Sequence, residues 1–438
     1  MTRDELLYNL RLMVTYRDAV RTRVPALFRR LMERYREGAR TGAARLQGKA
    51  QVDVAFFLTI PGMWKADYLF RALQQHPRFH PYVVIYPYSV NKGFNDASLW
   101  ETIHRTEAFV KERNFEYVIP YDEATHSWLD IRKTLDPDVV FFSTPYRDIP
   151  PQFYVYNFRD RLTLYIPYAF TSMKLYKLNY DMTALNLYGL YLLETPIHKA
   201  MAEQHARAHG ANCVVTGYPG TEVYLRNDYT PVDVWKKQAH PKKRVIWAPH
   251  HTIGDTFDVS TFLIYCDTML RLAEQYADQI QFAFKPHQLL KFKLEQRWGV
   301  ERTRDYYQHW SDLSNGQCEE AGYVDLFLHS DAMIHDSGSF TTEYLFVNKP
   351  VMYLTKHEHP EEKYNEFGVK ALDCHYIGRS EADIEHFLNS VVLQGNDPRQ
   401  AQRQAFFESY LKPHDGRLPS EQIMQILLDA VEGKPLPL

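Results

Sequence analysis

The stretch "IHDSGSFTTEYLFVNKPVMYL", residues 334–354, sets five small residues between two apolar runs. The first run ends at Asp336, and the second begins after Lys349 and Pro350. Short apolar runs that are separated by a small-residue turn and a helical segment are typical of a strand–helix–strand crossover in a parallel sheet. We expect a strand that ends at Asp336, a turn, a helix and a second strand. The stretch therefore predicts an α/β fold.

The same alternation continues in both directions, as two successive series of strands. The expected strands of the first series are 52–58, 82–86, 117–119, 138–143, 162–166 and 213–217, and those of the second are 244–249, 280–286, 331–336, 351–354 and 374–377. Two series of similar size predict two doubly wound, Rossmann-like domains that face each other across a cleft. The expected divisions are a basic helical extension over 1–50, a first domain over 51–235, a second domain over 236–410 and a C-terminal helix over 411–438.

Composition places the chain among ordinary globular proteins. Of its 438 residues, 45% are hydrophobic and 24% are charged, which excludes disordered and fibrous classes. The four cysteines form no CxxC pair, which argues against a zinc site and against a disulfide framework. No apolar run approaches the roughly 18 to 20 residues that cross a bilayer, and the first ten residues lack the order of a signal peptide. We therefore expect a cytoplasmic protein.

The net charge of −3 is distributed unevenly. Residues 1–50 carry twelve Lys or Arg and five Asp or Glu, which gives a local net charge of +7. Apolar residues recur in this part at helical spacing, namely Val24, Leu27, Phe28, Leu31 and Tyr35. The pattern fits two hypotheses equally: residues 1–48 rest on the anionic inner face of the cell membrane, or the helix packs on the body of the protein. No basic patch continues beyond residue 50, so we expect no nucleic-acid partner.

Residues that directly follow the expected strands are the best candidates for a binding site. In doubly wound sheets, ligands bind outside the carboxyl ends of the strands. In the second domain these positions hold His250 and His251, then Lys285 and His287; in the first domain, a turn at Gly62 follows the first strand. Histidines and a lysine at neighbouring strand ends predict an edge that binds phosphate and carries titratable groups.

The small-residue turn over 337–339 has two interpretations. A strand, a turn and the start of a helix would aim backbone N–H groups and hydroxyls at one point, which suits a phosphate. Alternatively, Ser339 or Thr341 merely caps the helix. The neighbouring histidines and lysine favour phosphate binding, and the candidate residues are Asp336, Ser337, Gly338, Ser339, Thr341 and Thr342.

A metal site is not expected. The histidines have no acidic partners at ligand spacing, and the chain contains no HExxH arrangement. A GxSxG elbow, a P-loop and a GxGxxG motif are also missing from the sequence. Charge on a departing phosphate would instead be stabilised by the helix N-terminus, serine hydroxyls, Lys285 and His287, so we expect no cofactor.

The order of several segments resembles a known family. These segments are "VVTGYPG" (214–220), "WAPHHT", "FKPHQ", "DLFLHSDAMIHDSGSFTTEYLFVNKPVMYL" and "DGRLPSEQI". The chain is similar to the CDP-glycerol glycerophosphotransferases, the teichoic-acid-type polymerases and primases, most clearly over 244–423. The resemblance implies a two-domain glycosyltransferase-B (GT-B) fold and transfer of glycerol phosphate, or of a similar polyol phosphate, from a CDP-activated donor to a cell-surface polymer or a lipid-linked acceptor.

The resemblance also implies roles for individual residues. The turn 337–339 and Thr341 would hold the diphosphate of the nucleotide donor. His287 would contact the donor phosphates and help the leaving group to depart, although Gln288 stands where the family has a proline.

The expected general base is harder to place. The family commonly has a His-Gly-Thr-Pro segment in the first domain, whose histidine acts on the acceptor hydroxyl. The nearest equivalent here is "YIPYAFTSM" (165–173), which has no histidine. His250 or His251 is therefore the expected base, with Asp67 or Asp148 as alternatives.

The acceptor is expected to bind the first domain, where tyrosines gather over 150–181. The tyrosine rings could line a binding site for a polyol, or they could form part of the hydrophobic core. The acceptor candidates, which lie at or beyond strand ends, are Tyr165, Tyr168 and Gly62.

Two other functions stay open. One is a GT-B glycosyltransferase that uses a CMP- or UDP-activated sugar in capsule or surface polysaccharide synthesis. The other is a non-catalytic scaffold subunit of polymer assembly, which the missing acceptor-side histidine favours. A pocket that gathers His250, His251, His287 and Ser337 would count against the scaffold.

Overall fold

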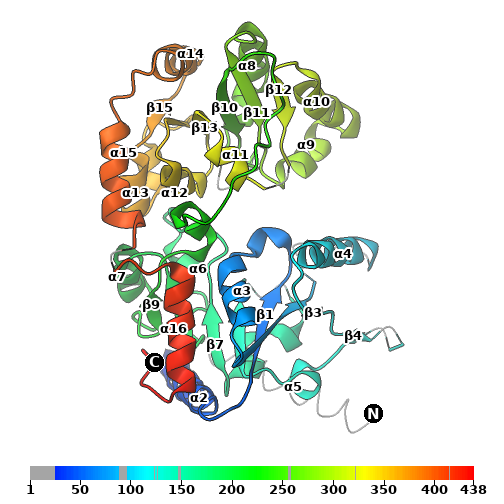
Figure 1. Ribbon diagram of the computed structural model, residues 1–438, viewed down its shortest axis with the longest axis vertical. Helices are drawn as coiled ribbons and strands as arrows, with labels where there is room; N and C mark the ends of the chain where they lie inside the picture. The colour runs from blue at the N-terminus through cyan, green and yellow to red at the C-terminus, as the bar shows by residue number, and fades with distance from the viewer. Residues whose placement is uncertain are drawn as a thin grey trace. The chain divides into compact units, whose positions relative to one another are not determined.

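The computed structural model describes residues 25–438, with gaps at 88–95, 123, 126, 147–148, 255–257, 321 and 414. The first 24 residues of the basic extension and the alternative base Asp148 lie outside the described residues. The chain forms two compact units (Figure 1). Unit 1 comprises the described residues up to Thr171, Leu175–Glu222 and Pro413–Leu438, and unit 2 comprises Ser172–Lys174 and Val223–Lys412.

Unit 1 is built on a seven-stranded parallel sheet with the order β3-β2-β1-β6-β7-β8-β9. Its strands are β1 (Val52–Leu58), β2 (Phe79–Ile85), β3 (Tyr117–Val118), β6 (Val139–Phe142), β7 (Leu162–Tyr165), β8 (Leu190–Leu193) and β9 (Cys213–Val215). The short strands β4 (Tyr121–Asp122) and β5 (Ser127–Trp128) form a separate antiparallel pair. The strand order reverses between β1 and β6, so the carboxyl ends of these two strands flank the switch point of the sheet.

Helices cover both sheets. Those of unit 1 are α2 (Pro25–Ala44), α3 (Asp67–Gln75), α4 (Asp96–Glu112), α5 (Ile131–Thr134), α6 (Tyr176–Tyr180), α7 (Pro196–His205) and α16 (Pro419–Val431). Those of unit 2 are α8 (Phe262–Gln275), α9 (Leu290–Trp298), α10 (Val300–Asp312), α11 (Val324–Leu328), α12 (Phe340–Glu343), α13 (Glu366–Leu372), α14 (Glu381–His386) and α15 (Gln400–Phe406). None of the described helices combines the length and the apolar character needed to span a membrane.

Helix α2 is part of the body of unit 1. Phe28, Leu31 and Tyr35 form its buried stripe, and the helix packs against β7. A Cβ atom on Gly38 would lie 1.8 Å from the carbonyl oxygen of Arg159, so only glycine permits this close approach. The apolar stripe that a membrane helix would insert into lipid is therefore used for packing, and the exposed part of α2 is rich in arginine and also includes Leu27.

Unit 2 is built on a six-stranded parallel sheet with the order β12-β11-β10-β13-β14-β15. Its strands are β10 (Lys243–Ala248), β11 (Ile280–Phe284), β12 (Gly316–Cys318), β13 (Ala332–His335), β14 (Val351–Leu354) and β15 (Tyr376–Gly378). Counted within the unit, this order is 3-2-1-4-5-6, the Rossmann order, with its switch point between β10 and β13. The prediction of an α/β protein with two Rossmann-like domains is confirmed.

The units divide the chain differently from the expected boundaries. Residues 223–235 belong to unit 2, because Trp235 is buried there and its indole N–H donates to the carbonyl oxygen of Leu326 (3.3 Å). Helix α16 returns to unit 1, where Ile423 and Leu427 are fully buried in the core beside α3. In both cases the burial of apolar side chains determines the unit to which the segment belongs. The polar composition of the expected linker did not predict this assignment.

Candidate functional site

The carboxyl-end edge of the unit 2 sheet brings most of the expected site residues together. Strand β10 is followed by His250 and His251, and its neighbour β11 is followed by Lys285 and His287. Strand β13, on the other side of β10, is followed by the turn 337–339. These strands are adjacent and parallel, so the residues after them lie at the switch point, where doubly wound sheets bind their ligands.

His250, His251 and His287 form a compact group, which we call the histidine cluster. The ring centroids are 4.3 Å apart for His250 and His251, 4.2 Å for His251 and His287, and 4.9 Å for His250 and His287. One ring nitrogen from each residue lies within 4.8 Å of those of the other two. Three imidazoles at these separations can contact one small ligand together.

Burial keeps His250 and His287 neutral. It lowers the pKa of His250 to about 3 and the pKa of His287 to about 2, because a charged imidazole loses its hydration there. The neighbouring histidines and lysines disfavour a further positive charge and lower both pKa values in addition. A bound anion would act in the opposite direction and raise both pKa values.

The proton of neutral His287 lies on its Nε2 atom. The backbone N–H of Leu289 donates to Nδ1 of His287 (3.1 Å), so Nδ1 holds the lone pair and Nε2 holds the hydrogen. The backbone N–H of His287 donates to the carbonyl oxygen of Pro249 (3.0 Å), which fixes the residue against the end of β10. His287 therefore offers an N–H donor to a ligand while it is uncharged.

Three clustered imidazoles are also a set of ligands that Zn²⁺ accepts. A metal ligand must offer a lone pair, whereas the free nitrogen of His287 carries a proton as long as Leu289 occupies Nδ1. The positive charge of Lys285, which contributes to the low pKa of His287, would repel a cation as well. The hydrogen-bond pattern and the charge both suit an oxyanion better than a metal ion.

Lys285 brings a buried positive charge to the same edge. Its side chain is 8% exposed, and its ammonium group makes no hydrogen bond to another residue of the described chain. Burial lowers the pKa of Lys285, and the acidic residues Glu319 and Glu320 offset only part of this effect. A buried ammonium without a partner is costly, and phosphate oxygens would supply the missing acceptors.

Asp336, which the sequence predicts at the donor site, has protein partners for its carboxylate. The residue is buried, and its carboxylate accepts the backbone N–H of His250 (2.5 Å) together with the backbone N–H (2.5 Å) and hydroxyl (2.8 Å) of Thr261. Burial raises the pKa of Asp336 to about 6. Asp336 thus positions the loop between β10 and α8, which carries the first two histidines of the cluster.

The residues Ser337, Gly338 and Ser339, which we call the serine turn, follow β13 directly. The hydroxyl oxygens of Ser337 and Ser339 are 3.4 Å apart, and the side chain of Ser339 makes no capping hydrogen bond. Helix α12 is only one turn long and continues as the 3-10 helix η5 (Tyr344–Val347). The expected contribution of a helix dipole is therefore small, and the hydroxyls are the main polar groups of the turn.

Both threonines of the motif point into unit 2. The hydroxyl of Thr341 donates to the carbonyl oxygen of Ser337 (3.0 Å) and shares a hydrogen bond with the hydroxyl of Tyr364 (2.9 Å). Thr341 and Thr342 have no exposed surface. Their expected contact with a donor stays a prediction, and the bond from Thr341 to Ser337 holds the serine turn from its buried side.

Sequence reasoning missed one segment that contacts the serine turn. The hydroxyl of Ser172 donates to the carbonyl oxygen of Gly338 (2.5 Å), and a Cβ atom on Gly338 would lie 2.8 Å from Sδ of Met173. Met173 itself forms an antiparallel bridge with Tyr364. Residues 172–174 are more than 160 positions away from the turn, so no local sequence signal marks this contact.

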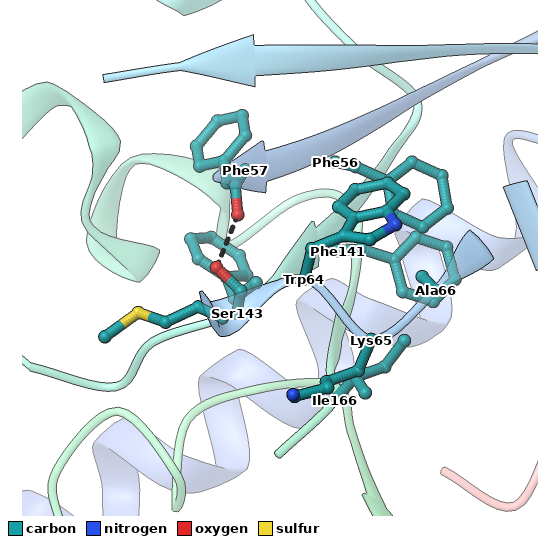
Figure 2. Close-up of a pocket in the computed structure, with 10 residues that line it drawn as sticks. Phe56, Phe57, Trp64, Lys65, Ala66, Phe141, Ser143 and Ile166 are labelled. Atoms are coloured by element: carbon teal, nitrogen blue, oxygen red, sulfur yellow. Dashed lines mark hydrogen bonds between the residues drawn. The ribbon is translucent and has the colours of Figure 1, made fainter. Parts of the chain in front are cut away.

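Unit 1 has a hollow at its own switch point (Figure 2). The residues that line it are Phe56, Phe57, Met63, Trp64, Lys65, Ala66, Phe141, Phe142, Ser143 and Ile166. Figure 2 shows the aromatic side chains of Phe56, Trp64 and Phe141 gathered together, with Lys65 beside Ile166. The hydroxyl of Ser143 donates to the carbonyl oxygen of Phe57 (2.7 Å). The hollow is thus largely apolar and has one cationic side chain.

The expected acceptor residues differ in their exposure. Tyr165 is only 4% exposed and stacks on Tyr188, with ring centroids 5.3 Å apart, and burial raises its pKa well above the usual value. It is part of the core, and the expected acceptor contact stays a prediction. Tyr168 is partly exposed and shares a hydrogen bond with the hydroxyl of Tyr146 (2.8 Å). Gly62 is exposed in the 3-10 helix η1 (Pro61–Met63), whose last residue lines the hollow.

Two successive Rossmann-like units are the architecture of the GT-B fold. Solved structures share this fold along most of the chain. A histidine variant of the wall teichoic acid polymerase TagF, soaked with CDPG, has 13% identity and a TM-score of 0.56, with coverage of 96% of this chain and 98% of that one. The S. aureus MnaA–UDP co-structure has 16% identity and a TM-score of 0.54, with coverage of 88% and 99%. The UDP-GlcNAc 2-epimerase of Neisseria meningitidis, bound to UDP-GlcNAc, has 14% identity and a TM-score of 0.50, with coverage of 86% and 100%.

The sequence itself identifies the family. Residues 173–429 match the CDP-glycerol:poly(glycerophosphate) glycerophosphotransferases, and the chain belongs to this family. No curated protein sequence matches the chain. The family resemblance and the function that it implied, a CDP-glycerol glycerophosphotransferase-type transferase, are thereby confirmed.

Proposed function

We propose that the histidine cluster, Lys285 and the serine turn together bind the diphosphate of CDP-glycerol. The observation that carries the proposal is the pair of unused donors at one strand-end edge: the Nε2–H group of His287 and the unpartnered ammonium of Lys285. Charge-assisted hydrogen bonds from such groups to phosphate oxygens are short and strong. The hydroxyls of Ser337 and Ser339 would add neutral donors on the side of β13.

The reaction is a phosphoryl transfer at the β-phosphorus. An acceptor hydroxyl oxygen forms a bond to this phosphorus, the bond from phosphorus to the bridging oxygen breaks, and CMP leaves with the electron pair. The proton of the hydroxyl passes to a general base. The negative charge that develops on the departing phosphate is stabilised by Lys285 and His287, and the protein needs no further group for this step.

We assign the general base to His250 or His251. The segment 165–173 holds no histidine in place of the family's acceptor-side residue. Nδ1 of His250 shares a hydrogen bond with the hydroxyl of Thr252 (3.0 Å), which leaves Nε2 for the acceptor. Its low pKa suits a base only after a donor anion has bound, because the anion raises that pKa towards neutrality.

The acceptor is proposed to be a growing polyol phosphate polymer or a lipid-linked precursor, and its end is proposed to bind the hollow of unit 1. The ammonium of Lys65 would attract an acceptor phosphate, and the ring of Trp64 would pack against the C–H groups of the polyol. Replacing Lys65 with Ala should raise KM for the acceptor and leave the Kd of CDP-glycerol unchanged.

Contact with an anionic membrane is proposed to involve the exposed face of α2. Arg29, Arg30 and Arg34 lie on this face, while the apolar stripe of the helix is buried. The contact is therefore electrostatic, without insertion into lipid. It would hold the enzyme at the inner face of the cell membrane, where lipid-linked acceptors are found.

Calorimetric titration tests the donor proposal. Purified protein is titrated with CDP-glycerol, a CMP-activated sugar acid and a UDP-sugar, and the experiment is repeated with the variants His287→Ala and His287→Gln. We expect selective binding of CDP-glycerol, a loss of about tenfold or more in the Ala variant, and partial recovery in Gln, whose amide N–H lies near the position of Nε2.

Other outcomes would point elsewhere. Preference for a sugar nucleotide would favour a glycosyltransferase, and failure to bind any nucleotide would favour the scaffold. The close grouping of His250, His251 and His287 already argues against the scaffold, because a non-catalytic subunit has no need of three neighbouring imidazoles. Binding of CDP-glycerol that is equal in all three proteins would remove His287 from the donor site.

A further inference from the structure

Glu194 is a buried acid of unit 1 that no step described above uses. It directly follows β8, so it lies at the carboxyl-end edge of the unit 1 sheet, where a doubly wound sheet binds its ligands. The residue is only 5% exposed and forms no ion pair with a described basic residue. Burying a carboxylate without a counter-ion is costly, so its hydrogen bonds have to offset the loss of hydration.

Only one oxygen of this carboxylate has partners. Oε1 of Glu194 accepts the backbone N–H (3.0 Å) and the hydroxyl of Thr171. Oε2 is buried and has no hydrogen-bond partner in the part of the chain that the structure describes. A carboxylate accepts hydrogen bonds on both oxygens, so half of the capacity of Glu194 is left for another donor.

The carboxylate is also held rigidly. Nε2 of His198 is 2.8 Å from the carbonyl oxygen of Thr171, and a carbonyl can only accept, so Nε2 carries the hydrogen. Nδ1 of His198 then accepts the hydroxyl of Thr195 (2.7 Å). Thr171 is thus bonded at its N–H, its hydroxyl and its carbonyl. Because its partner Thr171 is fixed from both sides, the Glu194 carboxylate is oriented before any ligand binds.

A second free polar group lies near Glu194. Tyr165 is the last residue of β7, the strand that pairs with β8, and its hydroxyl makes no hydrogen bond to a described residue. Burial raises the pKa of Tyr165 well above its usual value, and Tyr168, Tyr146 and Glu194 are close enough to add to this shift. An alcohol both donates and accepts, so it can bond to a carboxylate oxygen and to a tyrosine hydroxyl at once.

Side-chain contacts connect this edge with the hollow of unit 1. Lys65, the cationic residue of the hollow, lies beside Tyr218, since a Cβ atom on Gly220 would be 2.9 Å from Cδ of Lys65 and 2.7 Å from the ring of Tyr218. The rings of Tyr218 and Phe170 meet edge to face, with centroids 5.3 Å apart. Phe170 directly precedes Thr171, the residue that the buried carboxylate holds. The hollow and the carboxylate therefore belong to one continuous part of unit 1.

We propose that Oε2 of Glu194 accepts a hydrogen bond from a hydroxyl of the polyol acceptor, and that Tyr165 is the second partner of this hydroxyl. The attacking hydroxyl has to face the general base, so Glu194 holds the hydroxyl next to it. Glu194 thereby selects a polyol over a simple alcohol, while Lys65 attracts the phosphate of the acceptor. The proposal rests on the proposed acceptor site in unit 1.

Two acceptors that differ by one hydroxyl test this role. The probes are a soluble glycerol phosphate oligomer and the same oligomer with a 3-hydroxypropyl phosphate terminus, which keeps the primary hydroxyl and lacks the middle one. Calorimetry without CDP-glycerol measures the Kd of each probe for the wild type and for Glu194→Gln. The glutamine keeps an acceptor for Thr171 and replaces the free oxygen with an NH2 group, which cannot accept.

We expect the wild type to bind the complete oligomer about tenfold or more tightly than the analogue, because a site built to bond a hydroxyl rejects a ligand without it. In Glu194→Gln the two Kd values should agree within about threefold. A residue that only held Thr171 would weaken both probes equally when replaced. Glu203→Gln is the matched control, because Glu203 is an exposed acid on α7 of the same unit, and it should keep the discrimination.

The opposite outcomes are equally clear. Equal affinity of the wild type for the two probes would overturn the proposal, even if the glutamine variant failed to fold, because water would then satisfy the free oxygen. Discrimination that persists in Glu194→Gln would assign the hydroxyl to another residue. If the wild type bound CDP-glycerol and neither oligomer, the acceptor site in unit 1 would be wrong. Failure of the donor site is separate, since it appears as lost CDP-glycerol binding and leaves the discrimination between the oligomers intact.

Discussion

The carboxylate of Asp336 accepts the backbone N–H of His250 at 2.5 Å, and this bond joins the end of β13 to the loop that follows β10. Asp336 is one residue from the serine turn, and His250 belongs to the histidine cluster. The two halves of the proposed donor site are therefore held together by one buried acid. Thr261, at the start of α8, makes two further bonds to the same carboxylate.

Protonation of Asp336 should disturb the donor site. Burial raises its pKa to about 6, so below about pH 6 the group becomes a carboxylic acid and accepts its three donors less well. We expect kcat/KM for CDP-glycerol to fall on the acid side of pH 6. Asp336→Asn should lower kcat/KM by about tenfold at neutral pH and remove this acid limb. A pH–rate profile of both proteins checks the prediction, and an unchanged acid limb in the variant would contradict it.

Protonation of Asp336 should affect the free energy of unfolding in the opposite direction to activity, so that this residue stabilises the protein more at low pH. Its folded pKa lies above the ordinary value of 3.8, so the native state binds this proton more tightly than the unfolded state. The contribution to the free energy of unfolding is fully present below about pH 4 and is lost as the pH rises through about 6. Urea titrations of the wild type and Asp336→Asn over pH 4 to 7 measure the difference.

Lys285→Met should separate binding from stability. The variant removes the ammonium proposed to contact the diphosphate, and the Kd of CDP-glycerol should rise by about tenfold or more. It also removes a charge that burial disfavours, so Tm should stay the same or increase. Lys291→Met is the matched control, because Lys291 is partly exposed and its ammonium has two partners, the carboxylate of Glu320 (3.3 Å) and the ring of Tyr307 (5.1 Å to the centroid). Equal donor affinity in the two variants would count against the role of Lys285.

Gly338→Ala should displace the serine turn through Met173. The added methyl group would lie 2.8 Å from Sδ of Met173, and relief of this clash should weaken CDP-glycerol binding by a few fold. Combining it with Met173→Ala makes room and should restore part of the binding. Gly322→Ala serves as a control, since a Cβ atom there meets no atom within 4 Å. If the double variant binds as weakly as Gly338→Ala alone, the clash is not the cause.

His80 should give unit 1 a pH-dependent contribution to stability. Its Nδ1 is 2.8 Å from a carboxylate oxygen of Asp53 and its Nε2 is 3.1 Å from one of Glu116, and these bonds raise its pKa. The stabilisation by His80 is fully present below pH 6.5, the ordinary pKa of histidine. It is lost as the pH rises through the raised pKa of His80 in the folded protein. The site is partly exposed, so His80→Gln should cost only about 0.5 kcal/mol at pH 5.5 and close to nothing at pH 9. Urea unfolding at the two pH values tests this, and an equal cost at both would refute it.

Reversing charge on α2 should weaken binding to anionic vesicles. The combined variant Arg29→Glu, Arg30→Glu and Arg34→Glu should reduce co-sedimentation at least tenfold, because each basic residue near such a surface contributes about 1 kcal/mol. Arg304→Glu, on an exposed site of unit 2, is the control for net charge. Raising the salt concentration should abolish binding of the wild type. Unchanged binding by the triple variant would assign membrane contact to another surface or to none.

Much of the fold could be predicted from hydrophobic runs alone. The expected strand over 52–58 coincides with β1, and the buried strands β10, β13 and β14 were each found within two residues. Strand β8 was missed because its apolar run, Leu190–Leu193, is only four residues long. Strand β12, Gly316–Cys318, has no apolar run, and only its pairing with β11 makes it a strand.

The candidate site was predictable in its location but not in its details. Strand ends in a doubly wound sheet meet at one edge, so His250 and His287 could be expected to lie together. The direction of a side chain depends on tertiary packing, however, and sequence could not tell that Asp336 and Thr341 face inwards. The contact of Ser172 with Gly338 also needs the folded chain, because it joins residues 166 positions apart.

The return of α16 to unit 1 sets an order for folding. Residues 223–412 of unit 2 are synthesised without interruption, whereas the core of unit 1 lacks Ile423 and Leu427 until α16 has been made. The carboxylate of Glu222 also lacks its partners until α16 has been made. It accepts the backbone N–H (2.7 Å) and the hydroxyl (2.6 Å) of Ser420 at the start of that helix. On the ribosome, unit 2 can therefore fold first, although most of unit 1 precedes it in the chain, and unit 1 is completed last.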